Sequence, residues 1–333
     1  MVGRRDGVAE RLVEAAGIRL ETLDISGVDI GSAGGVARAT TQVTRATIAA
    51  RRLLRRMRPD VVVGAGGYVS VPVVVAALAQ RIPVVLLEQN AVPGRATRML
   101  AGRARIVAAS FAETASHLPH ARVVHTGNPI RAEIRAVTSR PAGDRLRSVL
   151  VTGGSQGARR LNRAIAGCMV ELLSKDLELR IVHQCGRLDY EAVERAAAAL
   201  PPPLAARYTV SAFFDDMAMR IGQSDLVVMR AGGSSIAECS ALGRPMIVVP
   251  YPHAGGHQRH NAAPYAAAGA ALLIDDADCT PERIGTEISA LVADPTRWHA
   301  MSAASAALGL PDATDAVVRL IVEAAGPTRS KAA

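Results

Sequence analysis

The feature that most constrains the fold is an alternation of short β-branched runs with alanine-rich stretches of helical pattern. Apolar strands that alternate with helices are typical of parallel sheets buried on both faces. The sequence therefore predicts an α/β protein built from parallel sheets. The predicted strands cover residues 60–63, 83–87, 105–108, 122–125, 148–152, 179–184, 207–211, 225–229, 245–249 and 271–274. The predicted helices between them include 157–173, 190–199, 235–242 and 281–292.

The alternation breaks once, near the middle of the chain. The segment between the fourth and fifth predicted strands is polar and contains Pro141 and Gly143, so it is predicted to be a linker. A chain of 333 residues has room for two domains that each bury a core. We expect a first domain over 1–131, the linker over 132–147, a second domain over 148–310, a helix over 311–325 that packs back on the first domain, and a tail over 326–333.

Composition excludes several classes of protein. Hydrophobic residues make up 49% of the chain, far too many for a disordered protein. Aromatic residues make up 3%, which argues against a nucleic-acid binder that stacks bases. The longest apolar stretch, 69–79, falls short of the roughly 20 residues of a membrane span. The four cysteines form no C-x-x-C pair, which favours reduced thiols over disulfides or a zinc site.

The net charge of +9 is carried by the first half of the chain. Residues 1–148 have a net charge of +11, and residues 149–333 have a net charge of −2. One predicted helical stretch holds five arginines: Arg51, Arg52, Arg55, Arg56 and Arg58. A solvated helix face is the ordinary interpretation of such a run. The alternative is contact with an anionic lipid surface, worth about 1 kcal/mol per basic residue.

A glycine-rich loop follows the predicted strand 148–152 and opens a helix. Its residues after Thr152 are Gly153, Gly154, Ser155, Gln156 and Gly157. Glycines let the backbone approach a ligand closely, and free N–H groups at the start of a helix suit a phosphate. The spacing matches neither the P-loop nor the G-x-G-x-x-G pattern. A tight strand–helix turn without a ligand is the alternative.

A second motif, RAGGSSIAE over 230–238, follows the predicted strand 225–229. Ser235 and Glu238 have the spacing of a capping box, in which Glu238 would bind the backbone at the start of the helix. Alternatively, the Glu238 carboxylate accepts hydrogen bonds from the two hydroxyls of a ribose, as acidic residues do in other nucleotide sites. The sequence pattern leaves both interpretations open.

A third cluster of polar side chains lies in the segment PYPHAGGHQRHNA, residues 250–262, after the predicted strand 245–249. It holds His253, His257, Gln258, His260 and Asn261. His257 and His260 lack the i, i+4 spacing of a zinc-binding H-E-x-x-H helix. A hydrogen-bonding wall for a sugar is therefore the better interpretation.

Three shorter polar loops follow predicted strands of the first half. They are GAGGYVS at 64–70, EQNAVPG at 88–94 and GNPIR at 127–131. Each loop by itself fits ordinary turn chemistry. Ligands of parallel α/β folds bind at the carboxyl ends of the strands, so we expect these loops to line a cleft between the two domains.

Taken together, these motifs resemble those of the MurG family. The matching segments, in the family's order, are GAGGYVSVP, EQNAVPGRATR, TGNPIR, VTGGSQGAR, FFDDM, RAGGSSIAE and PYPHAGGHQRHNA. Members of that family transfer N-acetylglucosamine from UDP-N-acetylglucosamine to lipid I and so form lipid II, the precursor of peptidoglycan. The resemblance implies the GT-B fold, in which two Rossmann-like domains face a cleft. The donor would bind the C-terminal domain and the lipid acceptor the N-terminal one.

The resemblance also implies roles for individual residues. Ser155 would contact the donor, the Phe214 backbone would bind uracil, and Glu238 would hold the ribose. The positions implied to bind the UDP-sugar are Asn90, Arg131, Ser155, Phe214, Gly232, Gly233, Ser234, Ser235, Glu238, His257 and Gln258. The loop residues Gly153, Gly154, Gln156 and Gly157 would hold the diphosphate. The positions implied on the acceptor side are Gly66, Gly67, Tyr68 and Ser70.

The sequence departs from the family pattern in several places. His257 stands where the family often has Gln, and Leu87 where it often has His. The family also opens with a strand, a GGTGGH loop and a helix that have no counterpart here, and the histidine of that loop is its candidate general base. We therefore expect an incomplete first domain with a split sheet. The catalytic base stays unassigned, with His125 and His253 the nearest alternatives.

The implied function is that of an inverting N-acetylglucosaminyltransferase of peptidoglycan synthesis, peripheral on the cytoplasmic face of the cell membrane. Its partners would be UDP-N-acetylglucosamine, lipid I, an anionic lipid surface and the cell-wall synthesis machinery, without nucleic acid. The family pattern implies that no metal or other cofactor is required. Two alternatives stay open: an impaired protein that binds the UDP-sugar without turnover, and a related GT-B enzyme such as a glycolipid glycosyltransferase or a UDP-sugar epimerase.

Overall fold

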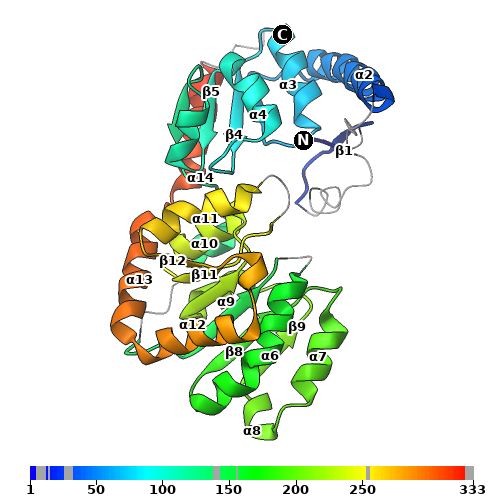
Figure 1. Ribbon diagram of the computed structural model, residues 1–333. Coiled ribbons are helices and arrows are strands. Elements are labelled where there is room, and N and C mark those ends of the chain that lie inside the picture. Colours follow the sequence, from blue (N-terminus) through cyan, green and yellow to red (C-terminus); the bar gives the residue numbers. More distant parts are fainter. Residues whose placement is uncertain are drawn as a thin grey trace. The chain divides into compact units, whose positions relative to one another are not determined.

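The structure is a computed structural model that describes residues 1–4, 13, 16–25, 33–137, 143–154, 157–252 and 256–326, with the backbone alone for 33–38. The chain divides into two units, which are drawn in Figure 1. Unit 1 consists of Met1–Gly127 and Thr314–Ala333, and unit 2 of Asn128–Ala313. Both units contain parallel sheets with helices, so the predicted α/β class is confirmed.

The main sheet of unit 1 has four parallel strands in the order β3-β4-β5-β6. Their bounds are Val62–Gly64, Val84–Glu88, Ile106–Ala109 and Val123–His125. Helices α2 (Ala33–Met57) and α3 (Ser70–Ala79) pack on one face of this sheet. Helix α14 (Ala313–Ala325) packs on the other face, beside β5 in Figure 1. Unit 1 also contains the short elements α4 (Arg95–Leu100), η1 (Ala101–Arg103) and η2 (Ala112–His117).

Two further strands of unit 1, β1 (Val2–Arg4) and β2 (Glu21–Leu23), pair with each other in parallel. Among the described residues they form a sheet of their own, which is not hydrogen-bonded to β3. This agrees with the split sheet that the sequence predicts for the first domain. Strand β3 is consequently an edge strand, and its Val63 is 39% exposed.

Unit 2 has a six-stranded parallel sheet in the order β12-β11-β10-β7-β8-β9. The strands are β7 (Ser148–Thr152), β8 (Arg180–Gln184), β9 (Tyr208–Ser211), β10 (Leu226–Met229), β11 (Met246–Val248) and β12 (Ala271–Leu273). The chain order reverses between β7 and β10. In open parallel sheets, ligands bind at the carboxyl ends of the strands beside such a reversal.

Helices cover both faces of the unit 2 sheet, because alternate strand residues point to opposite sides. Val149 and Val151 face one cluster of helices, and Leu150 faces the other. The first cluster is α6 (Arg159–Lys175), α12 (Pro281–Ala293) and α13 (Pro295–Leu308). The second is α5 (Ala132–Ala136), α9 (Met217–Gln223), α10 (Gly233–Ala241) and α11 (His257–Ala267). Unit 2 also contains the short elements α7 (Tyr190–Ala198), α8 (Pro202–Ala205) and η4 (Asp276–Asp278).

Part of the predicted linker, 132–147, is structured within unit 2, which corrects that prediction. Residues Ala132–Ala136 form α5, and its Ile134 is 1% exposed in the cluster that includes Ile130 and Ile221. The apolar residues Ile130 and Ile134 lie four positions apart, so they share one side of the chain as it enters the helix. The segment is mostly polar, so its composition gives no sign that Ile134 is buried in the core of unit 2.

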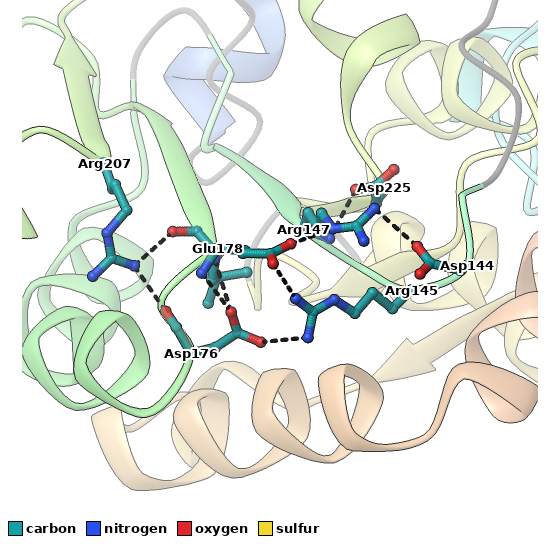
Figure 2. A network of polar contacts seen from close by, with 8 residues as sticks. Asp144, Arg145, Arg147, Asp176, Glu178, Arg207 and Asp225 are labelled. Carbon is teal, nitrogen blue, oxygen red and sulfur yellow. Dashed lines mark hydrogen bonds and ion pairs between the residues drawn. The ribbon is translucent and has the colours of Figure 1, made fainter.

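Ion pairs anchor the start of β7 at the end of the sheet opposite the strand-end loops (Figure 2). Arg147 and Arg145 both bind the Glu178 carboxylate, at 2.6 and 2.7 Å. The Asp225 carboxylate accepts hydrogen bonds from the backbone N–H groups of Arg147 and Ser148, both at 2.9 Å. These contacts tie the residues just before β7 to unit 2.

A buried polar cluster lies between β8, β9 and α6. His183 on β8 is 0% exposed, and its ring nitrogens contact the Tyr208 hydroxyl at 2.7 Å and the Asn162 side-chain oxygen at 3.0 Å. The Asn162 amide nitrogen donates to the Cys185 carbonyl and to Asp189, both at 2.8 Å. Because the amide nitrogen faces these two acceptors, the amide oxygen faces His183 and accepts from its Nε2–H. Burial lowers the pKa of His183 to about 4, so the ring is neutral at neutral pH.

Candidate nucleotide-sugar site

Two cavities open at the carboxyl ends of the unit 2 strands. The smaller, of about 240 Å³, is lined by residues that include Arg131, Thr152, Gly154, Gln184, Phe213, Ser235 and Glu238. The larger, of about 600 Å³, is lined by residues that include Gly153, Gly157, Arg159, Arg160, Arg230, Tyr251 and Gln258. Gly154 of the glycine loop after β7 lines both cavities.

The glycine loop turns too tightly for side chains at several positions. A Cβ atom at Gly153 would lie 2.3 Å from the Ala158 nitrogen, and one at Gly157 would lie 2.2 Å from the Cys185 carbonyl oxygen. Gly154 and Gly157 adopt φ of +81° and +79°, a conformation that glycine adopts without strain. The predicted loop is thus present as a strand–helix turn. Ser155 and Gln156 lie outside the described residues, so their contacts with a ligand stay predictions.

Glu238 does not form a capping box, which settles one of the two open interpretations. Helix α10 begins at Gly233 with Gly232 as its N-cap, so Ser235 is already the third helical residue. The Glu238 carboxylate instead accepts two hydrogen bonds from Arg131, at 2.7 Å from Nε and 2.9 Å from Nη2. The extended backbone of Gly232 lets the helix start earlier than the serine pattern indicates. The Glu238 side chain is 10% exposed and lines the smaller cavity.

Arg131 reaches Glu238 from the TGNPIR segment, more than 100 residues earlier in the chain. The hydrogen bond to Glu238 raises the pKa of Arg131, so this arginine keeps its charge. In the same segment, the Asn128 amide donates to the Ser234 hydroxyl at 3.3 Å. The structure therefore brings together Arg131, Ser234, Ser235 and Glu238, four of the predicted UDP-sugar residues.

Phe214 forms part of the loop after β9. Its backbone N–H donates to the Gln184 side-chain oxygen at 2.9 Å, and the Arg220 guanidinium lies 3.8 Å above its ring. Phe214 is 9% exposed, whereas its neighbour Phe213 is 51% exposed and lines the smaller cavity. A flat aromatic surface next to backbone polar groups suits a nucleobase.

The third predicted cluster lies at the start of α11. Gln258 lines the larger cavity, and its side-chain oxygen accepts a hydrogen bond from the Tyr251 N–H at 2.9 Å. His257 is the first residue of α11 and is half-buried. His253 lies outside the described residues.

The larger cavity has an excess of positive charge. Three guanidinium groups line it, and two carboxylates pair with them. Arg159 binds Asp189 at 3.2 Å, while Arg160 and Arg230 share Asp276 at 3.2 and 2.6 Å. Arginines beside a glycine loop suit an anion such as a diphosphate.

Apart from Arg131, which belongs to unit 2, the predicted site residues of the first half lie in unit 1. Glu88, at the end of β4, is 3% exposed and accepts hydrogen bonds from the Asn90 N–H, the Asn90 amide and the Gly94 N–H at 3.0–3.1 Å. Asn90 is thereby fixed in its loop. In the acceptor-side loop, Gly66 and Gly67 have φ of +87° and +75°. The Ser70 hydroxyl donates to the Gly66 carbonyl, and Tyr68 is 61% exposed.

The arginine run lies on the last two turns of α2 and just after them. Arg51, Arg52, Arg55, Arg56 and Arg58 are all exposed, while Leu53 and Leu54 between them are buried. Arg56 binds Glu21 at 3.1 Å. No helix in the described part of the chain has the length and hydropathy needed to span a membrane.

Two contributors to the site carried no prediction from sequence. Gln184 hydrogen-bonds the glycine loop and Phe214, and Arg230 reaches the larger cavity. A polar residue at the carboxyl end of a parallel strand is the signal that points to Gln184. Arg230 stands directly after β10 and carries the same signal.

The chain matches two family descriptions. Residues 1–109 match the glycosyltransferase family 28 N-terminal domain, and residues 148–317 match the glycosyltransferase family 28 C-terminal domain. The UDP-N-acetylglucosamine–N-acetylmuramyl-(pentapeptide) pyrophosphoryl-undecaprenol N-acetylglucosamine transferase of Rhodospirillum centenum is 41% identical over 97% of this chain and 85% of its own length. The protein with the same description from Halothermothrix orenii is 35% identical, over 97% of this chain and 90% of its own length.

Solved structures agree with these matches. The crystal structure of Acinetobacter baumannii MurG is 30% identical, with a TM-score of 0.76 over 96% of this chain and 89% of the other. A putative UDP-N-acetylglucosamine 2-epimerase from Listeria monocytogenes has a TM-score of 0.67 over 94% of this chain and 85% of the other, but at 19% identity it shows the fold alone. The two parallel-sheet units have the predicted GT-B fold. On these matches, which extend over both units, the chain belongs to the MurG family of glycosyltransferases.

Proposed function

We propose that this protein transfers N-acetylglucosamine from UDP-N-acetylglucosamine to undecaprenyl-pyrophosphoryl-N-acetylmuramyl-pentapeptide, which is lipid I, and so forms lipid II. The observation that carries this proposal is the 41% identity, over 97% of the chain, to a protein described by that transfer. The cavities at the strand ends of unit 2 support it, since they have the polar groups that a nucleotide-sugar requires.

The donor would bind unit 2 with its base and ribose in the smaller cavity. Glu238 would accept hydrogen bonds from the ribose hydroxyls, and the backbone around Phe214 would meet the uracil. The glycine loop and Arg230 would hold the diphosphate, and His257 and Gln258 the sugar. Asn90 is a further residue that the resemblance implies for donor binding, and it stays a prediction.

In the transfer itself, an acceptor hydroxyl oxygen forms a bond to C1 of N-acetylglucosamine. The bond between C1 and the diphosphate oxygen breaks, and its electron pair leaves with UDP. The acceptor hydroxyl loses its proton to a base, and the configuration at C1 inverts. Arginines near the diphosphate would stabilise the negative charge that develops on the leaving group.

We propose that the reaction needs no metal ion, because guanidinium and backbone N–H groups would take its place at the diphosphate. Turnover that is unchanged after treatment with a chelator supports this proposal. Loss of turnover that added magnesium restores would contradict it.

The acceptor has an undecaprenyl chain, so we propose that unit 1 works at a membrane surface. The exposed arginines of α2 would contact anionic lipid headgroups there, and the acceptor-side loop around Tyr68 would meet lipid I. We place this surface on the cytoplasmic face of the membrane, where UDP-sugars are available.

The decisive experiment supplies radiolabelled UDP-N-acetylglucosamine and lipid I in detergent micelles, and separates the lipid products by chromatography. Label in a lipid product with the mass of lipid II supports the proposal. A parallel sample without lipid I measures hydrolysis of the donor. Donor binding without any labelled lipid would overturn the transferase proposal in favour of a protein that only binds the UDP-sugar.

A further inference from the structure

Gln184 occupies a special place in the unit 2 sheet. It is the last residue of β8, and β8 lies between β7 and β9. A side chain at the carboxyl end of a middle strand can therefore reach the loops that follow both neighbours. Gln184 is 3% exposed and points to the face with α9 and α10, where it lines the smaller cavity.

The Gln184 amide uses both of its ends. Its oxygen accepts from the Phe214 N–H at 2.9 Å, while its nitrogen faces the Thr152 hydroxyl oxygen at 3.3 Å and the Gly154 carbonyl oxygen at 3.4 Å. A backbone N–H can only donate and a carbonyl can only accept, so these partners fix which end of the amide faces which loop.

The same contacts close the turn of the glycine loop. The Thr152 hydroxyl oxygen accepts a further hydrogen bond from the Gly154 N–H at 3.1 Å. Gln184 thus holds both the hydroxyl and the carbonyl oxygen of this turn, and it holds the Phe214 backbone with its other end. One buried side chain joins the segment after β7 to the segment after β9.

We propose that Gln184 is a positioning residue for the nucleotide. It sets the spacing between the glycine loop, which holds the diphosphate, and the Phe214 segment, which holds the base. A ligand that contacts both segments benefits from this spacing, because the site is already in the geometry that the ligand requires. The inference rests on the proposed function for the identity of the nucleotide.

The test measures UDP binding to the full chain by calorimetry, without any acceptor. Gln184→Leu removes all three hydrogen bonds while keeping a side chain of similar size, and we expect its UDP dissociation constant to rise about tenfold or more. Uridine has no diphosphate and would not meet the glycine loop, so its affinity is expected to fall less than that of UDP. In turnover, KM for the UDP-sugar is expected to rise while kcat changes less than about threefold.

Tyr208→Phe is the matched control. It removes one buried hydrogen bond, to His183, from the neighbouring strand on the opposite face of the sheet. Its thermal midpoint is expected to fall while its UDP affinity stays at the wild-type value. A merely structural role for Gln184 predicts this same pattern for Gln184→Leu, and that result would overturn the inference.

Gln184→Glu is the second variant, and it tests the positioning role of Gln184 if the Gln184→Leu protein does not fold. Its carboxylate still accepts from the Phe214 N–H but donates nothing to the Gly154 carbonyl, so weaker UDP binding is again expected. Wild-type affinity in a folded Gln184→Glu protein would refute the positioning role. Failure of the proposed function looks different, because the wild-type chain itself would then not bind UDP.

Discussion

Two buried glutamates, one in each unit, make different use of the same functional group. Glu88 of unit 1 is 3% exposed and accepts three hydrogen bonds from its own loop, two of them from backbone N–H groups. Glu238 of unit 2 is also buried, but its partner is the half-exposed guanidinium at the end of the long Arg131 side chain, and Glu238 lines a cavity.

The difference separates a carboxylate that shapes a loop from one that is placed to bind. Backbone N–H groups in a fixed loop cannot move aside for a ligand without unfolding that loop. A guanidinium on a flexible stem can turn to a new partner when a ligand hydroxyl arrives. Burial alone therefore does not distinguish structural from functional carboxylates, whereas the identity of the partner does.

Replacing Glu238 has the largest expected effect on binding. Glu238→Ala removes the acceptor for two ribose hydroxyls, so UDP affinity is expected to fall roughly a hundredfold, or about 3 kcal/mol. Calorimetry with UDP measures this loss. Glu171→Ala, which removes an exposed carboxylate paired with Lys175, is the control and should bind as the wild type does. Equal affinities for Glu238→Ala and wild type would make Glu238 a partner of Arg131 only.

Replacing Glu88 is expected to act on stability instead. Glu88→Gln puts an NH₂ group against one of the N–H donors of the loop, which costs about 2 kcal/mol of unfolding free energy. UDP affinity should stay unchanged, since Glu88 lines neither cavity of unit 2. Denaturant unfolding measures the free energy of unfolding, and calorimetry on the same sample measures the UDP dissociation constant. Weaker UDP binding at unchanged stability would reverse the roles assigned to the two glutamates.

The local parts of this site could be predicted from sequence, and the distant pairings could not. Strand β7 has the predicted bounds, Ser148–Thr152, and the glycine loop follows it as expected, because β-branched runs and glycines act over a few residues. The Arg131–Glu238 pair joins segments more than 100 residues apart, and no periodicity records it. The capping-box pattern of Ser235 was a local signal that the earlier helix start at Gly233 overrides.

Helix α3 shows a second limit of sequence patterns. The stretch 69–79 is almost wholly apolar, so it has no amphipathic period to indicate a helix. Pro72 is the third residue of α3, in the first turn, where its missing N–H is no loss. Gln184 shows a third limit of sequence patterns. Its contacts with two loops depend on the strand order β7-β8-β9, which the sequence does not record.

Acid should weaken unit 2 through His183. Its pKa of about 4 in the folded protein lies below the ordinary value of 6.5, so the unfolded chain binds the proton first. The contribution of His183 to the free energy of unfolding is fully present above pH 6.5 and is lost as the pH falls towards 4. The expected slope reaches about 1.4 kcal/mol per pH unit. The described histidines of unit 1, at 117, 120 and 125, are exposed, whereas His183 is buried.

The measurement is the free energy of unfolding at pH 7.0, 6.0 and 5.0, for wild type and His183→Gln. The variant lacks the titrating ring, so its stability should fall less over this range. If the free energy of unfolding falls equally with pH in the two proteins, His183 contributes no pH dependence. The proposed acid sensitivity of unit 2 through this residue would then be wrong.

The smallest expected effect concerns the arginines of α2, where unit 1 differs from unit 2 in charge. Arg52→Gln removes one exposed basic residue from the proposed lipid-binding surface, worth at most about 1 kcal/mol, or about fivefold in binding to anionic vesicles. Cosedimentation with vesicles of one-third phosphatidylglycerol measures the change, and added salt should reduce it. Arg163→Gln, at an exposed position on α6 of unit 2, lowers the net charge equally and should leave vesicle binding unchanged. Equal losses in both variants would mean that total charge, rather than the α2 surface, governs vesicle binding. Unit 1 would then have no special role in binding the membrane.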